Sequence, residues 1–306
     1  MLPTTIDTST PPATIDPATR QRLRSALAAS KAPATRRAYR AAWTAWGAWA
    51  EAHNADALPA MPDAVAAYLA ARAEDGAGMA TLRMATAAIA AAHELADEAN
   101  PCASRAVKTI MRGLARQAAG APVRQAKALT ADAVAAIRGA LNGHVASNRR
   151  TARDMALVAV MADAGLRRSE TAALVWGDIT READGSGRVT IRRSKTDQEG
   201  AGTVVAVTPA AMADLDRLAA LGAPDQDTSV FGLSDRQIAR RIAAAAKAAG
   251  LGDGFTGHSG RVGMAQRMTR NGAPAAAVMR QGRWSTPRMV ARYTRNEAAA
   301  QALRYL

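Results

Sequence analysis

The sequence has a single cysteine, few aromatic residues and no long apolar run, and each shortage excludes a class of protein. Because Cys102 is its single cysteine, the chain can form neither an intrachain disulfide nor a cysteine-based zinc cluster. Aromatic residues make up 4% of the chain, so its cores must be built from Leu, Val, Ile, Met and a few Trp. No uncharged apolar run approaches the ~18 residues needed to cross a bilayer. Residues 1–16 lack the pattern of a signal peptide, and we expect a soluble protein of the reducing cytoplasm.

Basic residues, in contrast, are abundant. Lysine and arginine total 40 against 26 aspartates and glutamates, which gives a net charge of +14 and an isoelectric point near 11.1. An excess of this size indicates a polyanionic partner, because each phosphate that is neutralised releases condensed counterions. The basic residues are spread along the chain rather than gathered beside one hydrophobic segment, which favours nucleic acid over a membrane surface. A soluble protein that is basic without binding nucleic acid is the alternative.

Alanine-rich helical patterns fill the first 120 residues, with no strand pattern among them. Residues 1–16 are expected to be a disordered tail. Asp16 and Pro17 then open a first helix, with a capping residue followed by a proline in the first turn. Four further helices are predicted over residues 35–53, 62–74, 79–98 and 104–119.

A second unit follows a linker at residues 121–128. It begins at Thr130, a suitable helix cap, and two strand-like runs at residues 188–193 and 203–208 interrupt its helices. The polar residues between these runs form the tip of a short hairpin. Helical patterns resume at Ser234, Gly260, Pro274 and Pro287 and continue to the end of the chain. The predicted fold class is therefore mainly α, with a small antiparallel sheet in the second unit.

Two pairs of charged residues in the second unit have the same spacing. Arg167 and Glu170 lie three residues apart and would share one face of a helix. His258 and Arg261 are separated by the same interval, between glycines. Taken alone, the first pair is more typical of a surface ion pair, and the second of a polar helix start.

Three further residues complete an ordered set. Lys195 lies at the hairpin tip, where a lysine is ordinarily solvated, and Trp284 precedes Tyr293 by nine positions, where both rings would ordinarily pack in a core. Their order along the chain is more specific than any single member. The set resembles the catalytic residues of the tyrosine recombinases, the phage integrase family, at Arg167, Glu170, Lys195, His258, Arg261, Trp284 and Tyr293. Residues 257–296 look most like the Cre type of this family, which has Trp rather than His at the position of Trp284.

The resemblance implies a complete domain plan and an activity. Residues 17–120 would form a helical core-binding domain on DNA, residues 121–128 the linker, and residues 129–306 an α-rich catalytic domain with a small antiparallel sheet. The last helix would dock in a neighbouring subunit. The expected activity is site-specific recombination, in which strands are cleaved and rejoined through a 3′-phosphotyrosyl intermediate and a Holliday junction.

The chemistry of a phosphodiester explains why these residue types belong together. Two guanidinium groups, Arg167 and Arg261, can hold both non-bridging oxygens and neutralise the charge of the transition state. Lys195 can protonate the departing 5′ oxygen as general acid. His258 can assist the Tyr293 nucleophile as a base or donate a hydrogen bond to the phosphate.

The remaining two residues would support the reaction. Trp284 can donate its indole N–H to a phosphate oxygen, and Glu170 can orient Arg167 or the histidine. The phosphotyrosyl bond stores the energy for rejoining. The sequence has neither a glycine-rich phosphate loop nor clustered carboxylates for Mg²⁺. We therefore expect no cofactor, no metal and no requirement for ATP.

The DNA contacts are expected on three helices. Two of these helices would enter the major groove in the first domain, and one would approach DNA in the second. The predicted contact residues are Arg37, Arg40 and Thr44, then Arg83 and Met84, and finally Arg236 and Gln237. A solvated basic face is the alternative for the first of these helices.

The expected partner is double-stranded DNA with inverted half-sites. Free protomers would be monomeric and would form a homotetramer in the synaptic complex, without membrane association. The protein would act in a bacterial cytoplasm, encoded by the bacterium or a phage, on chromosomal or plasmid DNA.

Two alternatives use nearly the same residues or the same fold. A type IB topoisomerase-like enzyme would relax supercoiled DNA by a similar covalent step. A non-catalytic DNA-binding protein of this fold would typically have lost a catalytic position, and no position is missing here.

Overall fold

A computed structural model describes residues 32–119, 125–141, 148–192 and 202–302. The chain divides into two compact units, Met1–Val123 (unit 1) and Arg124–Leu306 (unit 2). The predicted N-terminal tail, the helix at Asp16 and Pro17 and the hairpin tip with Lys195 lie outside the described residues. Within the described part of the chain, no helix is long and apolar enough to cross a membrane.

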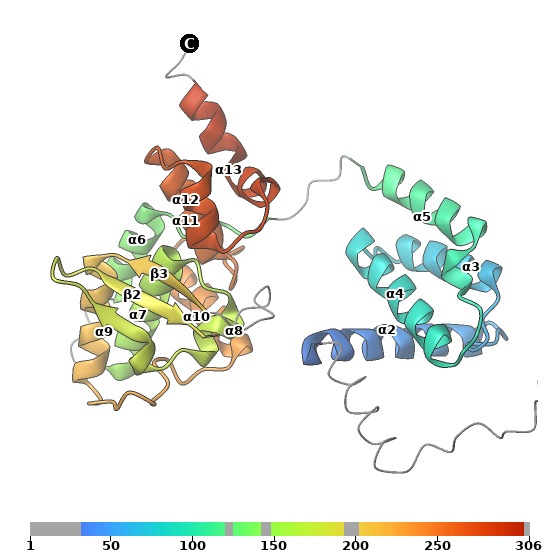
Figure 1. Ribbon diagram of the computed structural model, residues 1–306, viewed down its shortest axis with the longest axis horizontal. Helices are drawn as coiled ribbons and strands as arrows, with labels where there is room; N and C mark the ends of the chain where they lie inside the picture. Colours follow the sequence, from blue (N-terminus) through green and yellow to red (C-terminus); the bar gives the residue numbers. More distant parts are fainter. Residues whose placement is uncertain (1–31, 120–124, 142–147, 193–201, 303–306) are drawn as a thin grey trace, which may run out of the picture. The chain divides into compact units, whose positions relative to one another are not determined.

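Unit 1 is a group of helices without a strand among its described residues (Figure 1). Its elements are α2 (Pro33–Ala52), α3 (Pro62–Glu74), α4 (Met79–Leu95), the short 3₁₀ helix η1 (Pro101–Ala103) and α5 (Arg105–Gln117). The bounds predicted for α3 are confirmed. The prediction that the fourth helix reaches residue 98 is wrong: α4 ends at Leu95, and Asp97 takes a left-handed conformation that a continuing helix does not allow.

Aromatic rings fill the core of unit 1. Trp46 is fully buried, stacks on Trp49 at 5.8 Å between ring centroids and meets Tyr68 edge-on at 5.2 Å. From α4 the buried stripe consists of Leu82, Ala85, Ala88, Ile89 and His93. His93 is held by two backbone groups, because its Nε2 accepts from Ala60 N at 2.8 Å and its Nδ1 lies 2.8 Å from Ile89 O.

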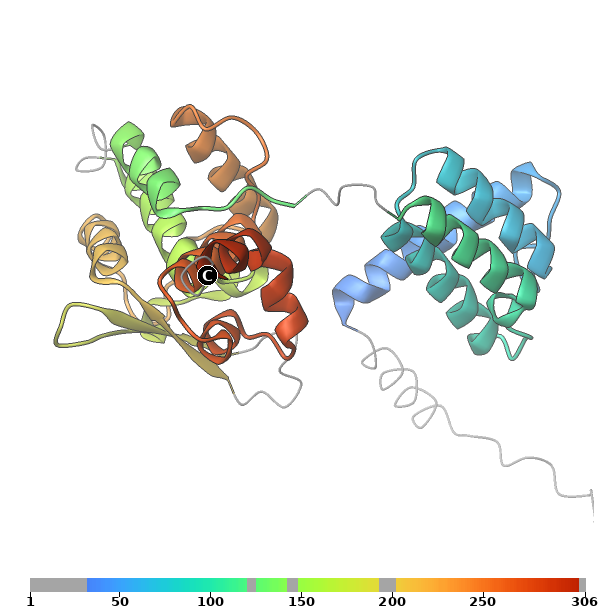
Figure 2. The same cartoon turned by 90° about the horizontal axis from the view of Figure 1, so that it is seen from above.

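Unit 2 contains the sheet. Its elements are α6 (Ala131–Leu141), α7 (Arg149–Ala164), α8 (Arg168–Ala173), η3 (Trp176–Asp178), β1 (Ile179–Arg181), β2 (Gly187–Ile191), β3 (Thr203–Val207), α9 (Pro209–Ala220), α10 (Asp235–Ala248), α11 (Ser259–Arg270), α12 (Ala275–Gly282) and α13 (Pro287–Ala302). The strands form an antiparallel sheet in the order β1-β2-β3, with Val189 opposite Val205. Figures 1 and 2 show this sheet on one side of the helices of unit 2.

The two predicted strands are present with shorter bounds, because β2 ends at Ile191 and β3 at Val207. The sequence interpretation left out β1 and α9. The start of α9 nevertheless carries an ordinary signal: Thr208 accepts from Ala211 N as the cap, and Pro209 follows it.

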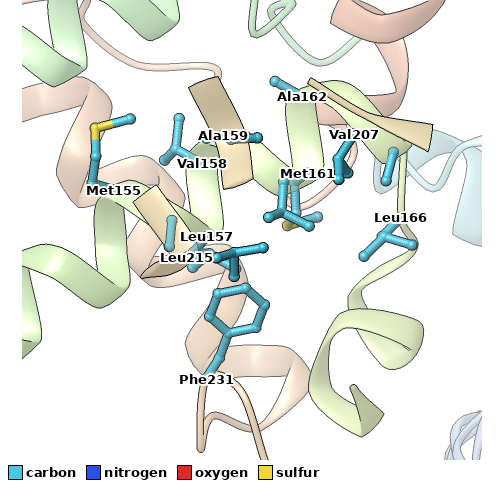
Figure 3. Packing of buried hydrophobic residues seen from close by; sticks show 14 of the residues in the cluster. Met155, Leu157, Val158, Ala159, Met161, Ala162, Leu166, Val207, Leu215 and Phe231 are labelled. Carbon is cyan, nitrogen blue, oxygen red and sulfur yellow. The ribbon is translucent and has the colours of Figure 1, made fainter. Parts of the chain in front are cut away.

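Helix α7 runs through the centre of unit 2. Almost every residue from Ala152 to Ala164 is buried, which is typical of a helix packed on all sides. Figure 3 shows its side chains among those of neighbouring elements: Met155, Leu157, Val158 and Met161 with Leu166, Val207, Leu215 and Phe231. The end of this helix is therefore fixed on all sides, and the candidate site begins there.

Candidate functional site

Arg167 and Glu170 lie just beyond the end of α7. The helix stops at Gly165, whose left-handed backbone (φ 55°) turns the chain, and α8 begins after Arg167. The buried Glu170 carboxylate accepts from the Arg167 backbone N–H at 2.7 Å and from its Nη1 at 2.6 Å. Glu170 therefore binds Arg167, and orienting this arginine stays one of the two roles predicted for it.

His258 and Arg261 come from the start of α11. Arg261 is 2% exposed, and its two terminal nitrogens donate to the carbonyl oxygens of Gly165 (2.7 Å) and Gly282 (2.6 Å). These bonds join three segments that are far apart in the sequence. His258 precedes the first turn of α11 and is exposed.

Trp284 and Tyr293 lie next to Arg261 in the site. The Arg261 guanidinium lies over the Trp284 ring, with 5.0 Å between Cζ and the ring centroid, and the indole stacks on Tyr293 at 5.3 Å. Gly282 is required next to this ring, because a Cβ there would lie 2.6 Å from the indole. Both aromatic side chains are 7% exposed.

The backbone of α13 departs from helical geometry directly after Tyr293. Thr294 has φ −119° and ψ 18°, and its hydroxyl donates to Val290 O at 3.0 Å. Gln266 of α11 donates from Nε2 to the Tyr293 carbonyl at 3.2 Å. The segment that carries Tyr293 is thus bonded to α11 by Gln266, while the Thr294 hydroxyl makes its bond within α13.

The charges of the site influence each other strongly. Burial raises the pKa of Glu170, but Arg283 and Arg167 outweigh this and hold that pKa below its usual value. Burial, together with Arg167 and Arg283, lowers the pKa of Arg261 to about 10, so this guanidinium still carries its charge at pH 7.

The pKa of His258 is lowered by loss of hydration and by the positive charges of neighbouring arginines, chiefly Arg261. Its imidazole is therefore mostly neutral at pH 7, and a neutral imidazole can accept a proton.

Arg283 is part of this site, although the sequence interpretation assigned it no role. It lies between Gly282 and Trp284, and its side chain, 5% exposed, donates from Nη2 to Glu170 Oε2 at 2.8 Å. The sequence carries no local signal for this contact, because the two partners are 113 positions apart.

The structure brings together six of the seven residues predicted to be catalytic. Lys195, the seventh, lies outside the described residues. The six gathered in unit 2 are Arg167, Glu170, His258, Arg261, Trp284 and Tyr293. Of the other tyrosines, Tyr68 is buried in the core of unit 1.

The residues predicted to contact DNA lie on the surface of their helices. Those in unit 1 are Arg37, Arg40 and Thr44 on α2 and Arg83 on α4, all exposed. Met84 is half-buried and lines an open groove of about 420 Å³ between α2, α3 and α4. In unit 2, Arg236 and Gln237 are exposed at the start of α10. The Gln237 amide oxygen also accepts from Ser234 N and Oγ, both at 2.9 Å, so this side chain closes the helix cap as well.

Comparison with known proteins places this site in a family. Residues 127–300 match the model of the phage integrase family. The integrase/recombinase xerD homolog of Selenomonas ruminantium is 27% identical over 285 residues, which cover 86% of this chain and 82% of that protein.

Similar solved structures include a lambda integrase dimer bound to a COC′ core site (18% identity, TM-score 0.61, 89% of this chain and 75% of that chain). Another is the XerH recombinase bound to a palindromic difH substrate (16% identity, TM-score 0.58, 79% and 70%). These likenesses show the tyrosine recombinase fold. Because the family model matches more than half of the residues of this chain, the chain belongs to the phage integrase family.

Proposed function

We propose that this protein is a site-specific DNA recombinase that cleaves and rejoins strands through a 3′-phosphotyrosyl bond to Tyr293. The observation that carries the proposal is the cluster in unit 2, where Arg167 and Arg261 lie beside the Trp284–Tyr293 pair. Membership of the phage integrase family supports it. The intermediate between two exchanges is a Holliday junction.

In the cleavage step, Tyr293 Oη forms a bond to phosphorus while the bond from phosphorus to the 5′ oxygen breaks. The phenol proton passes to His258, which is mostly neutral at pH 7 because partial loss of hydration and the charges of nearby arginines lower its pKa. Lys195 gives a proton to the departing 5′ oxygen. Rejoining reverses these transfers, so neither an external energy source nor a metal is required.

The two arginines neutralise the charge that builds up on the non-bridging oxygens. Arg261 is fixed by two carbonyl oxygens and by the Trp284 ring, and Arg167 by the Glu170 carboxylate. Groups held in place before the substrate arrives lose little energy in reorganisation when the transition state forms. Trp284 supports the phosphate through its indole N–H.

The partner is double-stranded DNA with inverted half-sites. The net charge of +14 supports a DNA partner, as do the DNA complexes among the solved structures that resemble this chain. Unit 1 serves as the core-binding domain through the exposed residues of α2 and α4, and unit 2 as the catalytic domain. Protomers are monomeric when free and form a tetramer on two sites, joined by the segment from Glu297 onward.

A covalent-capture experiment tests the activity on a random pool of target sequences. The protein is incubated in EDTA with a library of nicked duplexes that carry randomised inverted arms, and DNA that stays attached after denaturation is sequenced. We expect an enriched half-site and a covalent adduct that Tyr293→Phe abolishes. Tyr39→Phe, the matched control in unit 1, should keep the adduct.

Either of two outcomes would contradict the assignment. An adduct that persists in Tyr293→Phe would mean that another residue is the nucleophile. Relaxation of a supercoiled circle without any joining of two captured sites would favour a topoisomerase-like activity instead.

A further inference from the structure

We propose that Arg283 is a positioning residue for strand cleavage, which links the two phosphate-binding arginines and holds Arg167 in place for the DNA phosphate through Glu170. This inference rests on the recombinase activity proposed above. Arg283 itself would not touch the DNA. It would act through Glu170 and through the end of α7.

The backbone of Arg283 is the first sign of a special role. Its φ of 52° lies in the left-handed region, which is unfavourable for residues with a Cβ and is the usual place of glycine after a helix. Here it ends α12, with Arg283 N bonded to Arg280 O and Trp284 N to Met279 O. A glycine would suit this turn better, so the side chain must be needed for something else.

The hydrogen bonds of the Arg283 side chain show what the side chain does. Nη2 donates to Glu170 Oε2 at 2.8 Å and to Gly165 O at 2.9 Å, while Nη1 donates to Ala164 O at 3.2 Å and Gln281 O at 3.0 Å. One guanidinium therefore holds the Glu170 carboxylate against the last carbonyl groups of α7. These carbonyls have no helical partner, so a cation suits them well.

Both of its main acceptors are shared with a phosphate-binding arginine. Gly165 O also accepts from Arg261 Nη1 at 2.7 Å, and Glu170 also accepts from Arg167. The contacts thus form one continuous series, which runs from Arg167 through Glu170, Arg283 and Gly165 O to Arg261. A displacement of Arg283 would reach both of the groups that must hold one phosphate.

The division of the Glu170 oxygens suggests how Arg283 matters for chemistry. Oε1 takes one terminal nitrogen of Arg167, while Oε2 is occupied by Arg283 Nη2 and the Arg167 backbone N–H. A free carboxylate prefers to bind a guanidinium through two parallel hydrogen bonds. Without Arg283, Oε2 can turn to the Arg167 side chain as well, and Glu170 would then hold this guanidinium in a different orientation toward the phosphate.

The electrostatics are consistent with this arrangement. Among the charges that lower the pKa of Glu170, Arg283 contributes most, so it keeps the carboxylate ionised in a buried place. The three arginines and one carboxylate leave an excess of positive charge, which suits a phosphate whose negative charge grows in the transition state.

A substrate without phosphate charge separates positioning from mere support of the fold. Adduct formation is measured in a single turnover on the captured duplex, once with the ordinary phosphodiester and once with a neutral methylphosphonate at the scissile position. Arg283→Gly keeps the turn and removes the side chain. We expect it to be roughly 10- to 100-fold slower on the phosphodiester, the range for one lost hydrogen bond to a charged group. On the methylphosphonate it should stay within about twofold of the unaltered protein.

Two variants accompany this measurement. Arg267→Ala is the matched control, since Arg267 of α11 also binds the end of α7, through Ala162 O and the buried Asp163 carboxylate, yet contacts neither Glu170 nor Gly165 among the described residues. It should slow both substrates equally or neither. Arg283→Lys keeps the charge but not the forked geometry, so its defect should be intermediate and again confined to the phosphodiester.

The outcomes separate this proposal from the one on which it rests. If the unaltered protein forms no adduct, the recombinase activity itself fails, and the role of Arg283 with it. If the unaltered protein cleaves and Arg283→Gly lowers the rate of adduct formation equally on both substrates, Arg283 only supports the fold. If Arg283→Gly does not fold, the same comparison is made with Arg283→Lys, and an equal loss on both substrates again overturns the proposal.

Discussion

The two units of this protein differ in what they bury. Unit 1 buries aromatic rings, with Trp46 and Tyr68 at its centre, and His93 of α4 is buried as well. Unit 2 buries charge: Asp154, Asp163, Glu170, Asp178, Asp214 and Arg261. The ion pairs between described residues also lie in unit 2.

This contrast reflects two ways of handling a polyanion. A surface that only has to attract and position DNA, the role proposed for α2 and α4, can keep its cations exposed, and Arg37, Arg40 and Arg83 are exposed. A site that must stabilise developing charge needs cations in fixed places, and buried carboxylates and carbonyls fix them in unit 2. Burying charge is costly unless each group is paired, and every buried carboxylate named above has an arginine partner.

The largest effect that the contrast predicts is on the stability of unit 1. Trp46→Ala removes a fully buried ring together with its contacts to Trp49 and Tyr68. It should lower the free energy of unfolding of unit 1 by about 3–5 kcal/mol. Hydrogen exchange read by mass spectrometry should show faster exchange in α2, α3 and α4, with α7 unchanged.

Trp43→Ala is the matched control on the same helix, because Trp43 is only partly buried. Its effect should be clearly smaller. Equal acceleration of exchange in both units after Trp46→Ala would mean that the units do not unfold separately, and the contrast would lose its meaning.

A second, smaller effect concerns the stability of unit 2 at low pH. The pKa of Glu170 is lowered in the folded protein, chiefly by Arg283 among its neighbours, against the opposing effect of burial. A carboxyl group whose pKa is lower in the folded than in the unfolded protein stabilises the folded state at pH values above the ordinary glutamate pKa of about 4.3. This contribution to stability is lost as the pH falls through the pKa of the folded protein. Unit 2 should therefore lose protection from hydrogen exchange below about pH 4.3 before unit 1 does.

Glu170→Gln tests the cause of this acid sensitivity. The variant should be less stable than the unaltered protein at pH 7, because three arginines lose their anion, and unit 2 should depend less on pH below that range. The exposed Asp184 and Asp225, whose pKa values are lowered by hydrogen bonds from Ser186 and Thr228, remain as a smaller source of acid dependence. An unchanged acid profile in Glu170→Gln would show that Glu170 is not the source of the acid sensitivity.

The same contrast marks what could be predicted from sequence. The bounds of α3 followed from Pro62 at its start and Asp75-Gly76 at its end, which are local signals. The candidate cluster in unit 2 followed from the order and spacing of its motifs along the chain. Both rest on short-range patterns that can be read without the three-dimensional arrangement of the chain.

What was missed depends on contacts between distant segments. β1 has three residues, too few for an alternating pattern, and forms because β2 offers it hydrogen bonds. Arg283 takes a left-handed backbone conformation that is usual for glycine. Its side chain contacts Gly165 and Glu170, which lie more than a hundred positions away. The strands were predicted one or two residues too long for the same reason, since pairing with a neighbour decides where each ends.

The smallest predicted effect concerns a neutral side chain in the charged unit. Gln266 donates to the Tyr293 carbonyl at 3.2 Å, at the point where Thr294 interrupts α13. Gln266→Met keeps the length of the side chain and removes the donor, so it should cost about 1 kcal/mol of stability, as one neutral hydrogen bond does. If this bond also holds the tyrosine in place, adduct formation should slow several-fold while DNA binding in gel shifts stays the same. Thr294→Val removes a different bond at the same kink, from its hydroxyl to Val290 O, and serves as the control for a general loosening of α13. Slower cleavage in Gln266→Met but not in Thr294→Val would show that the carbonyl contact positions the nucleophile, whereas equal rates in all three proteins would show that the stacking on Trp284 is sufficient.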